Sequence, residues 1–481
     1  MGRDGQTAEG QLPKYQQIIA YIKEKIAKGE WPIGSKIPSQ RTLASQFKVN
    51  RSTIITAIEE LTADGLIEGQ MGKGTVVVNN TWTLLATNPP PDWNAYVTSG
   101  VHKPSQDTVQ KINQDEFDAS LIQLSKGELS SEIFPLQTMQ RLMHKVTDNL
   151  HAFGYEEPKG YGPLRQAVSD YVRSFGIEAS PSSILIVSGA LQALQLISVG
   201  LLHRGSTVLL EKPSYLYSLH VFQSAGMKLT SLEMDAQGLL PGGISALRKQ
   251  GKADILYTNP CFHNPTGILM SKKRRQELMQ ACEAERLPVI EDDLYRELWF
   301  DEPPPAPLKA MDRHGHVLYL GSLSKTLSPG LRIGWIIGPE PVIERLADIK
   351  MQTDYGTSSL SQRVAAEWLT SGEYQKHVAY IREELRNRKA AMLEALGLHM
   401  SDLAEWESPA GGFFIWLKLK EKLPIHELFS KAQRQGVLLN PGSIYGQDRD
   451  RFLRLSYAYA SLPELREGIR LLADILKNMA K

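Results

Sequence analysis

The chain has 481 residues, of which 42% are hydrophobic and 22% are charged, and its formal net charge at pH 7 is +1. This length predicts about three domains. The net charge is close to zero, so it does not by itself indicate that the protein binds a polyanion such as DNA. The 2 cysteines have no metal-ligand spacing, so we expect no metal site and a reducing, cytoplasmic setting. We expect no membrane span and no signal peptide, because the sequence lacks the long apolar runs that they require.

The first 78 residues combine helical patterns with a hairpin signal. Residues 14–28 place isoleucines on one stripe, which predicts an amphipathic helix. Ser39 and Asn50 stand where the N-terminal caps of two further helices are expected. Residues 66–78 predict two short strands around a Gly-Lys-Gly tip. Three helices and a hairpin within residues 1–78 are typical of a winged helix-turn-helix domain.

Positive charge in this head is concentrated in one segment. Residues 36–58 contain four cations and no acidic residue. The second of the two capped helices would present Arg51, Ser52 and Thr53 at its first turn, where recognition helices offer side chains to the major groove and amides to phosphates. Lys73, at the hairpin tip, would reach a neighbouring groove or phosphate. The positive charge of this segment is by itself equally consistent with DNA binding and with a basic surface that contacts only solvent.

The segment "KIPSQRTLASQFKVNRSTIITAIEELTADGLIEGQMGKGTVV" resembles the GntR-type winged helix, with Ile37 in place of a common leucine. The resemblance implies that the residues at Arg41, Arg51, Ser52 and Thr53 contact DNA, together with the wing. We therefore expect double-stranded DNA as a partner.

Residues 79–112 differ in composition, because they are rich in Pro, Asn and Ser and contain three consecutive prolines. This composition favours an extended, semi-rigid linker. The alternative is that part of the segment packs on a neighbouring domain, since Trp82, Trp93 and Tyr96 are large side chains that avoid water.

From residue 113 to residue 481, apolar runs of strand type alternate with helical patterns. The runs are "SILIVS", "STVLLE", "DILYTN", "PVIEDD" and "HVLYLGS". This alternation predicts an α/β domain with a buried, mostly parallel sheet. From about residue 378, a long charged helix and the strands "GGFFIWLKLK" and "FLRLSYA" predict a smaller α+β lobe.

One stretch of the body, "SLSKTLSPGLRIGW", places Lys325 between serines and Arg332 just beyond a Pro-Gly turn. A lysine can condense with an aldehyde, and pyridoxal 5'-phosphate is the frequent partner. This cofactor needs the lysine, an anion cradle for its phosphate, an acid that keeps the pyridine nitrogen protonated, and a flat group against the ring.

Each of these needs has candidate residues. The phosphate candidates are a strand-to-helix turn with free amides and neighbouring hydroxyl and guanidinium groups, namely Gly189, Ala190, Leu191, Ser322, Ser324 and Arg332. Asp292, at the end of a strand, would hold the pyridine nitrogen. Tyr295 and Asn264 would donate hydrogen bonds to the ring oxygen, and Tyr215 would stack on the ring. Each residue alone has an ordinary explanation as a cap or a turn, and it is their joint order that is specific.

That order resembles the fold-type I aminotransferases of the aspartate aminotransferase group, over about residues 115–475. The resemblance implies that Lys325 forms the internal aldimine with the cofactor and that Arg454, in "RLSYA", binds the substrate α-carboxylate. It also implies a dimer in which Tyr155 reaches the cofactor phosphate of the other subunit. For Arg454 the alternative is a salt bridge at a strand edge.

The head, the linker and the body together resemble the MocR family of bacterial transcription regulators, over essentially the whole chain. The resemblance implies a cytoplasmic, head-to-tail homodimer that binds an operator with two half-sites. It implies that the protein senses an amino acid or an amine by forming an external aldimine, with little or no productive transamination.

Some amine-sensing members of that family carry an arginine two positions after the stacking tyrosine, where this chain has Tyr217. A γ-aminobutyrate effector is therefore not favoured, and D-alanine-like compounds are among the candidates. The identity of the effector, the operator and the direction of regulation stay open. The alternative function is a working pyridoxal phosphate-dependent aminotransferase that carries a DNA-binding head, because no residue of the cofactor site is missing.

Overall fold

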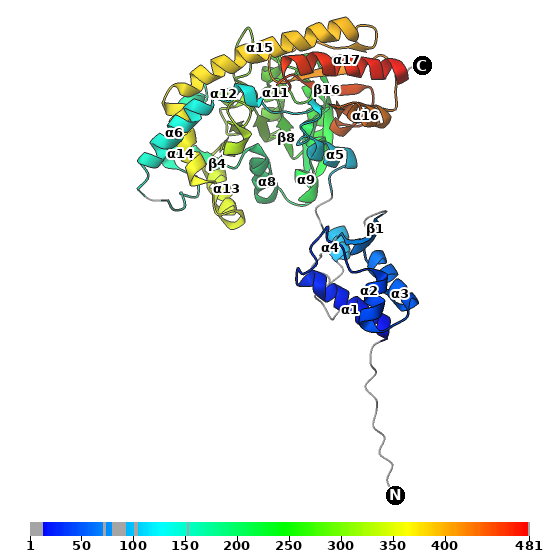
Figure 1. Ribbon diagram of the computed structural model, residues 1–481. Helices are drawn as coiled ribbons and strands as arrows, with labels where there is room; N and C mark the ends of the chain where they lie inside the picture. Colours follow the sequence, from blue (N-terminus) through cyan, green and yellow to red (C-terminus); the bar gives the residue numbers. More distant parts are fainter. Residues whose placement is uncertain (1–12, 71–73, 79–92, 101–103, 152, 480–481) are drawn as a thin grey trace. The chain divides into compact units, whose positions relative to one another are not determined.

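The chain divides into two compact units, residues 1–100 and residues 101–481 (Figure 1). Each unit has a hydrophobic core of its own. The computed structural model describes residues 13–70, 74–78, 93–100, 104–151 and 153–479. We describe the two units separately as the head and the body.

The head contains three helices and a two-stranded antiparallel hairpin. Its elements are α1 (Lys14–Ala27), α2 (Gln40–Phe47), α3 (Arg51–Ala63), β1 (Ile67–Gln70) and β2 (Gly74–Val77). Ile18 and Ile22 of α1 lie in one buried cluster with Leu43 of α2 and with Ile54 and Leu61 of α3. The predicted three helices and hairpin are therefore confirmed.

The two predicted helix caps have different outcomes. The Ser39 hydroxyl accepts a hydrogen bond from the Thr42 amide at 3.2 Å, as expected for the start of α2. Asn50 occupies the cap position of α3, but its side chain makes no capping hydrogen bond, so its predicted capping role is wrong. The Thr53 amide, which a cap would satisfy, instead donates to the Asn50 carbonyl at 3.1 Å.

The segment expected to be a linker contains two helices, α4 (Trp93–Ser99) and α5 (Asp107–Asp115). On α4, Trp93 and Tyr96 are exposed, contrary to the expectation that they avoid water, and their rings lie 5.6 Å apart. On α5, Val109 and Ile112 are buried in a cluster with Tyr445 and other residues of the body. The chain from α5 onward therefore belongs to the body, whereas Trp82 lies outside the described residues.

The body is built on an eight-stranded sheet with the strand order β4-β11-β10-β9-β8-β5-β6-β7. Its strands are β4 (Ile184–Val187), β5 (Thr207–Lys212), β6 (Lys228–Asp235), β7 (Gly238–Leu239), β8 (Ile255–Thr258), β9 (Val289–Asp292), β10 (Val317–Ser322) and β11 (Gly334–Ile337). The pairs from β10 through β9, β8 and β5 to β6 are parallel, while β11 and β7 pair antiparallel with their neighbours. The predicted mostly parallel sheet is confirmed.

Helices cover both faces of this sheet. They are α6 (Leu136–Asp148), α7 (Gly162–Arg173), α8 (Ala190–Leu201), α9 (Val221–Ser224), α10 (Ile244–Lys249), α11 (Lys272–Ala284), α12 (Leu308–Met311), α13 (Glu340–Thr353) and α14 (Ser359–Thr370). On β4, Ile184 and Ile186 pack in one cluster with α6, α7 and α14, whereas Leu185 and Val187 pack in another with α8 and α13. Alternate residues of a strand point to opposite faces, which explains why such strands are apolar throughout.

A smaller lobe follows from α15 onward and also receives the first strand of the body. Its elements are β3 (Ile122–Gln123), α15 (Glu373–His399), β12 (Ala404–Glu405), β13 (Phe414–Leu419), α16 (Ile425–Arg434), β14 (Val437–Leu438), β15 (Asn440–Pro441), β16 (Phe452–Ser456) and α17 (Leu462–Met479). Strands β12, β13, β16 and β15 form an antiparallel sheet, and the long helices α15 and α17 lie side by side (Figure 1).

Candidate functional site

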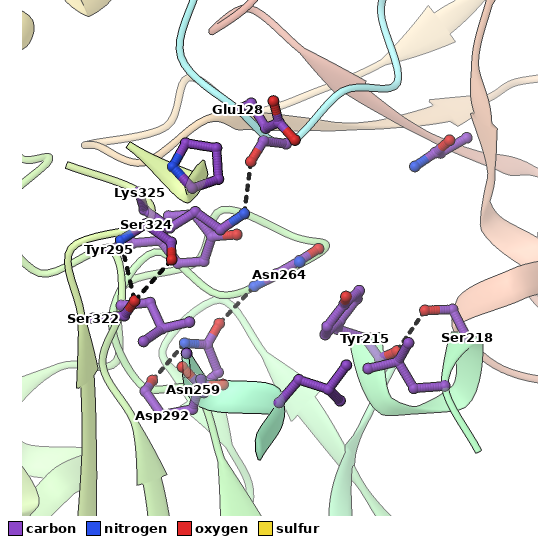
Figure 2. Close-up of a pocket in the computed structure, with 18 of the residues that line it drawn as sticks. Glu128, Tyr215, Ser218, Asn259, Asn264, Asp292, Tyr295, Ser322, Ser324 and Lys325 are labelled. Atoms are coloured by element: carbon purple, nitrogen blue, oxygen red, sulfur yellow. Dashed lines mark hydrogen bonds between the residues drawn. The ribbon is translucent and has the colours of Figure 1, made fainter. Parts of the chain in front are cut away.

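A cavity of about 380 Å³ brings together residues from distant parts of the body (Figure 2). This volume lies within the range of about 300–1,000 Å³ that small-molecule sites occupy. Twelve of the predicted site residues line it, namely Gly189, Ala190, Leu191, Tyr215, Asn264, Asp292, Tyr295, Ser322, Ser324, Lys325, Arg332 and Arg454. Tyr155 does not line this cavity; it is 81% exposed, and its ring lies 4.8 Å from the ring of Tyr355.

Lys325 follows the end of β10 and points into the cavity (Figure 2). Its amine donates a hydrogen bond to the Gly127 carbonyl at 2.7 Å. Desolvation by the cavity walls lowers the pKa of Lys325 to about 8, although the nearby Glu128 carboxylate opposes the shift. An amine with a lowered pKa is more often uncharged, and the uncharged form is the nucleophile.

The turn between β4 and α8 forms an anion cradle. Gly189 has a φ of +87°, which other residues rarely adopt, and a Cβ there would lie 2.6 Å from Nη2 of Arg332, so a side chain at this position would be strained. Arg332 donates from Nη2 to the Ser188 carbonyl at 2.6 Å, which places its guanidinium beside the first turn of α8. The Ser322 hydroxyl donates to the Ile333 carbonyl at 2.8 Å, and its oxygen lies 3.0 Å from the Ser324 hydroxyl oxygen on the same side of the cavity. This set of donors fits a phosphate group.

Asp292 is the last residue of β9 and is buried. The Tyr257 hydroxyl donates to its Oδ2 at 2.6 Å, whereas Oδ1 is buried without a hydrogen-bond partner among the described residues. Burial raises the pKa of Asp292 to about 6. A protonated pyridine nitrogen would supply the missing donor and would favour the charged carboxylate, so this residue fits the cofactor ring.

Three further residues surround the expected position of the ring. The backbone N–H of Asn264 donates to Asn259 Oδ1 at 2.7 Å, and Asn259 Nδ2 donates to the Asp292 carbonyl at 2.6 Å. Burial raises the pKa of Tyr295, so its hydroxyl stays protonated and able to donate. Tyr215, in a 3-10 turn over Tyr215–Ser218, is 37% exposed and lines the cavity.

Arg454 lies on β16 and is 5% exposed. It donates from Nη1 to Asn264 Oδ1 at 3.0 Å and from Nη2 to the Ser125 carbonyl at 2.6 Å, while its Nε has no partner among the described residues. Its guanidinium lies 4.1 Å from the centre of the Phe414 ring. Arg454 forms no ion pair with a described carboxylate, so the alternative role of Arg454 in a salt bridge at the strand edge is not supported. A buried guanidinium without a counterion is suited to bind an anion.

Several residues of the site were not predicted. Tyr257 and Asn259 belong to "DILYTN", which was interpreted only as a strand, although ligands bind outside the carboxyl ends of parallel strands and that rule would have indicated them. Gly127 contacts Lys325 across 198 positions of sequence. No pattern in the sequence pointed to Gly127 or to the neighbouring Glu116 and Glu128.

In the head, Arg41 on α2 and Arg51 and Ser52 on α3 are exposed, and Thr53 is half-buried. The Arg51 Nε donates to Gln40 Oε1 at 3.1 Å. In the described part of the head, neither arginine forms an ion pair with a carboxylate. Lys73 lies outside the described residues. Arg41 and Arg51 are thus available to a polyanion.

Two family models match the chain. Residues 119–472 match the family model of aminotransferase class I and II, and residues 14–77 match that of the gntR family of bacterial regulatory proteins. The uncharacterized HTH-type transcriptional regulator YdfD of Bacillus subtilis (strain 168) is 66% identical, and the match covers 98% of this chain and 97% of that protein.

Two solved structures resemble the body. The multiple substrate aminotransferase of Thermococcus profundus has a TM-score of 0.76 and 30% identity, covering 81% of this chain and 99% of that one. The α-aminoadipate aminotransferase LysN of Thermus thermophilus, solved in complex with N-(5'-phosphopyridoxyl)-L-leucine, has a TM-score of 0.72 and 30% identity over 78% of this chain and 95% of that one.

The fold and the cavity therefore define a pyridoxal phosphate-dependent body of the aminotransferase type, fused to a winged helix-turn-helix head. The chain belongs to the MocR family of transcription regulators. It is a DNA-binding regulator whose cofactor is pyridoxal phosphate, as the sequence predicted. None of the described helices is long and apolar enough to cross a membrane.

Proposed function

We propose that this transcription regulator senses an amino acid or an amine that binds in the cavity around Lys325. One observation carries the proposal: the amine of Lys325 lines the same cavity as the buried guanidinium of Arg454, which forms no ion pair with a described carboxylate. The first would bind a carboxylate, and the second marks the position where an amino group would react. Amino acids carry both groups on one carbon atom.

The residues of the cavity would divide the work as follows. Gly189, Ser322, Ser324 and Arg332 would hold the cofactor phosphate, and Asp292 would keep the pyridine nitrogen protonated. When bound, the cofactor supplies an aldehyde that captures primary amines reversibly. Lys325 would hold the cofactor until an effector amine takes its place, after which the lysine amine is free to accept or return a proton.

Helix α5 supports a route from the cavity to the head. Val109 and Ile112 of α5 line the cavity, and α5 follows directly on the segment that leads from the head along the chain. An effector that binds one arrangement of α5 better than another would shift the equilibrium between them by its difference in affinity. In a head-to-tail homodimer, with Tyr155 reaching the other subunit, such a shift would change the spacing of two heads. Helix-turn-helix dimers read half-sites about 34 Å apart or multiples of this distance.

On the DNA side, we propose that Arg41, Arg51, Ser52, Thr53 and Lys73 contact the operator. The exposed positions of the two arginines, which no described carboxylate neutralises, support this assignment. The wing residue Lys73 is included on the sequence pattern alone.

A second candidate function is catalytic transamination, and the completeness of the cofactor site favours it. The experiment that separates the two functions is a titration of the cofactor-loaded protein with amino acids and amines, D-enantiomers included, followed by visible absorbance. A persistent change of the band, coupled to altered binding of a DNA fragment selected by the protein from a random library, supports sensing. If an amino acid removes the absorbance band, a keto acid restores it, and this cycle repeats over many turnovers, the aminotransferase function is favoured. No change with any compound would contradict both functions.

A further inference from the structure

The charges that line the cavity exceed what the cofactor needs. Asp292, Lys325 and Arg332 are assigned to the pyridine nitrogen, the aldehyde and the phosphate. Among the described residues that line the cavity, three further charged ones are left, namely Arg454, Glu116 and Glu128. A ligand with a single carboxylate would match Arg454 and would leave two carboxylates of the protein facing it.

Glu116 is the more isolated of the two carboxylates. It is half-buried at the C-terminal cap of α5, and no ion pair joins it to another described residue. The only described hydrogen bond of its carboxylate is a long one of 3.5 Å, which Oε1 accepts from the Ser125 hydroxyl. Burial raises the pKa of Glu116, although the positive charges of Arg454 and Lys126 oppose the shift. The negative end of the α5 dipole adds to the preference for a cation here.

Glu128 stands beside the reacting amine. Figure 2 shows it on one side of Lys325, with Asp292 on the other. It is 4.0 Å from Lys126, which lies outside the cavity lining and also donates to the Glu116 carbonyl at 3.3 Å. Lys126 therefore compensates Glu128 in part, whereas it reaches the backbone and not the carboxylate of Glu116.

The wall near these carboxylates is apolar. Val109 and Ile112 of α5 line the cavity together with Ile444, and all three belong to one buried cluster. This wall would accept a short chain of methylene groups. The unpaired Nε of Arg454, which is 5% exposed, is an independent sign that the cavity is built for an anionic group as well.

We propose that the cavity selects a diamino acid, which is an α-amino acid with a second, cationic amino group at the end of a short aliphatic side chain. Its carboxylate binds Arg454, its α-amino group replaces Lys325, its methylene groups pack on Val109 and Ile112, and its distal ammonium binds Glu116 with help from Glu128. This proposal rests on the proposed sensing function and names the class of its effector.

The test compares ornithine with norvaline, which has the same chain length and lacks the distal amine, in both enantiomers. Each is titrated into the cofactor-loaded protein, and the dissociation constant is taken from visible absorbance and from calorimetry. We expect ornithine to bind about 10- to 100-fold more tightly than norvaline, since a charge-assisted hydrogen bond in an enclosed site is worth this factor. Equal binding, or tighter binding of norvaline or glutamate, would overturn the proposal and leave sensing intact.

The variant Glu116→Gln keeps the shape of the side chain and removes its charge. We expect it to abolish most of the preference for ornithine over norvaline, measured as the ratio of the two dissociation constants, and Glu128→Gln to reduce this ratio less. The matched control is Asp107→Asn, which removes one negative charge at the exposed start of the same helix and should keep the preference. If Glu116→Gln retained the full preference, Glu116 would not be the selecting residue. If no amino compound changed the absorbance of the unaltered protein, the sensing function itself would fail.

Discussion

The head and the body use the same kinds of cationic side chain in opposite environments. In the head, Arg41 and Arg51 lie at the surface and no described carboxylate neutralises them. In the body, Arg454 is buried and Lys325 lies in a cavity. Exposed cations keep their full charge, attract a polyanion over a distance and are screened by salt. Enclosed cations lose solvation, which favours the uncharged, nucleophilic form of a lysine and suits an arginine to bind one anion in a fixed geometry.

The largest expected effect in this comparison comes from Lys325→Ala. We expect complete loss of the visible cofactor band and of any effector response on DNA, because no other lysine among the described residues lines the cavity. The matched control is Lys350→Ala. Lys350 is also buried, its pKa is also lowered to about 8 by desolvation, and it does not line the cavity. If Lys350→Ala lost the band as well, or if Lys325→Ala kept it, the assignment of Lys325 would be wrong.

Arg454→Gln should have the next largest effect. Loss of a buried charged partner costs about 2–5 kcal/mol of binding free energy, so we expect the effector to bind at least about 30-fold more weakly. The cofactor band should persist, because the groups assigned to hold the cofactor are unchanged. Calorimetry with the effector and absorbance of the cofactor measure the two quantities separately, and loss of both together would point to a folding defect.

Gly189→Ala tests the anion cradle. The new Cβ would meet Arg332 at 2.6 Å, and overpacking of this kind costs about 1–3 kcal/mol, so we expect weaker retention of pyridoxal phosphate on dialysis. Gly205→Ala is the control, because Gly205 has a similar φ of +91° and open space around its Cβ position. Both variants strain the backbone, so the difference in their retention of pyridoxal phosphate measures the effect of the clash with Arg332. Equal retention by the two variants would contradict the assignment of this turn to the cofactor phosphate.

The lowered pKa of Lys325 predicts a pH dependence for the cofactor-free protein. Below about pH 8 the amine is mostly protonated and unreactive, and above this pH it is mostly uncharged. The initial rate of uptake of added pyridoxal phosphate should therefore rise by about tenfold per pH unit up to about pH 8 and then level off. Stopped-flow absorbance measures this rate. A rise that continues to the ordinary lysine pKa would mean that the amine is not desolvated.

The smallest expected effect belongs to the head. Arg51→Ala should weaken binding to DNA several-fold and, if the contact is to a phosphate, reduce the slope of log affinity against log salt by about 1. Fluorescence anisotropy at several salt concentrations measures both. Lys28→Ala is the control, because Lys28 is an exposed cation of the head that already pairs with Glu24 at 2.5 Å. Equal effects of the two variants would mean that only the total charge of the head matters.

Local patterns in the sequence were sufficient to predict much of the fold. The isoleucine stripe of α1 and the fully apolar strands of the body each reflect burial that alternates with a fixed period, so they predicted a helix and a two-sided sheet. The cavity residues Asp292 and Ser322 were also predictable, because both stand at the ends of parallel strands that converge at one edge of the sheet.

Tertiary structure decided the features that depend on segments far apart in the chain. The Ser125 carbonyl meets Arg454 across 329 positions and the Gly127 carbonyl meets Lys325 across 198 positions, and no local pattern encodes either contact. For the same reason, the sequence did not indicate that α5, most of which lies in the segment predicted to be a linker, would pack on the body and line the cavity. The sequence by itself thus determined the two domains, the cofactor and twelve of the residues that line the cavity. Only the packing of α5 and its neighbours decided which further charges line the cavity, because charge balance in a cavity depends on every segment that lines it.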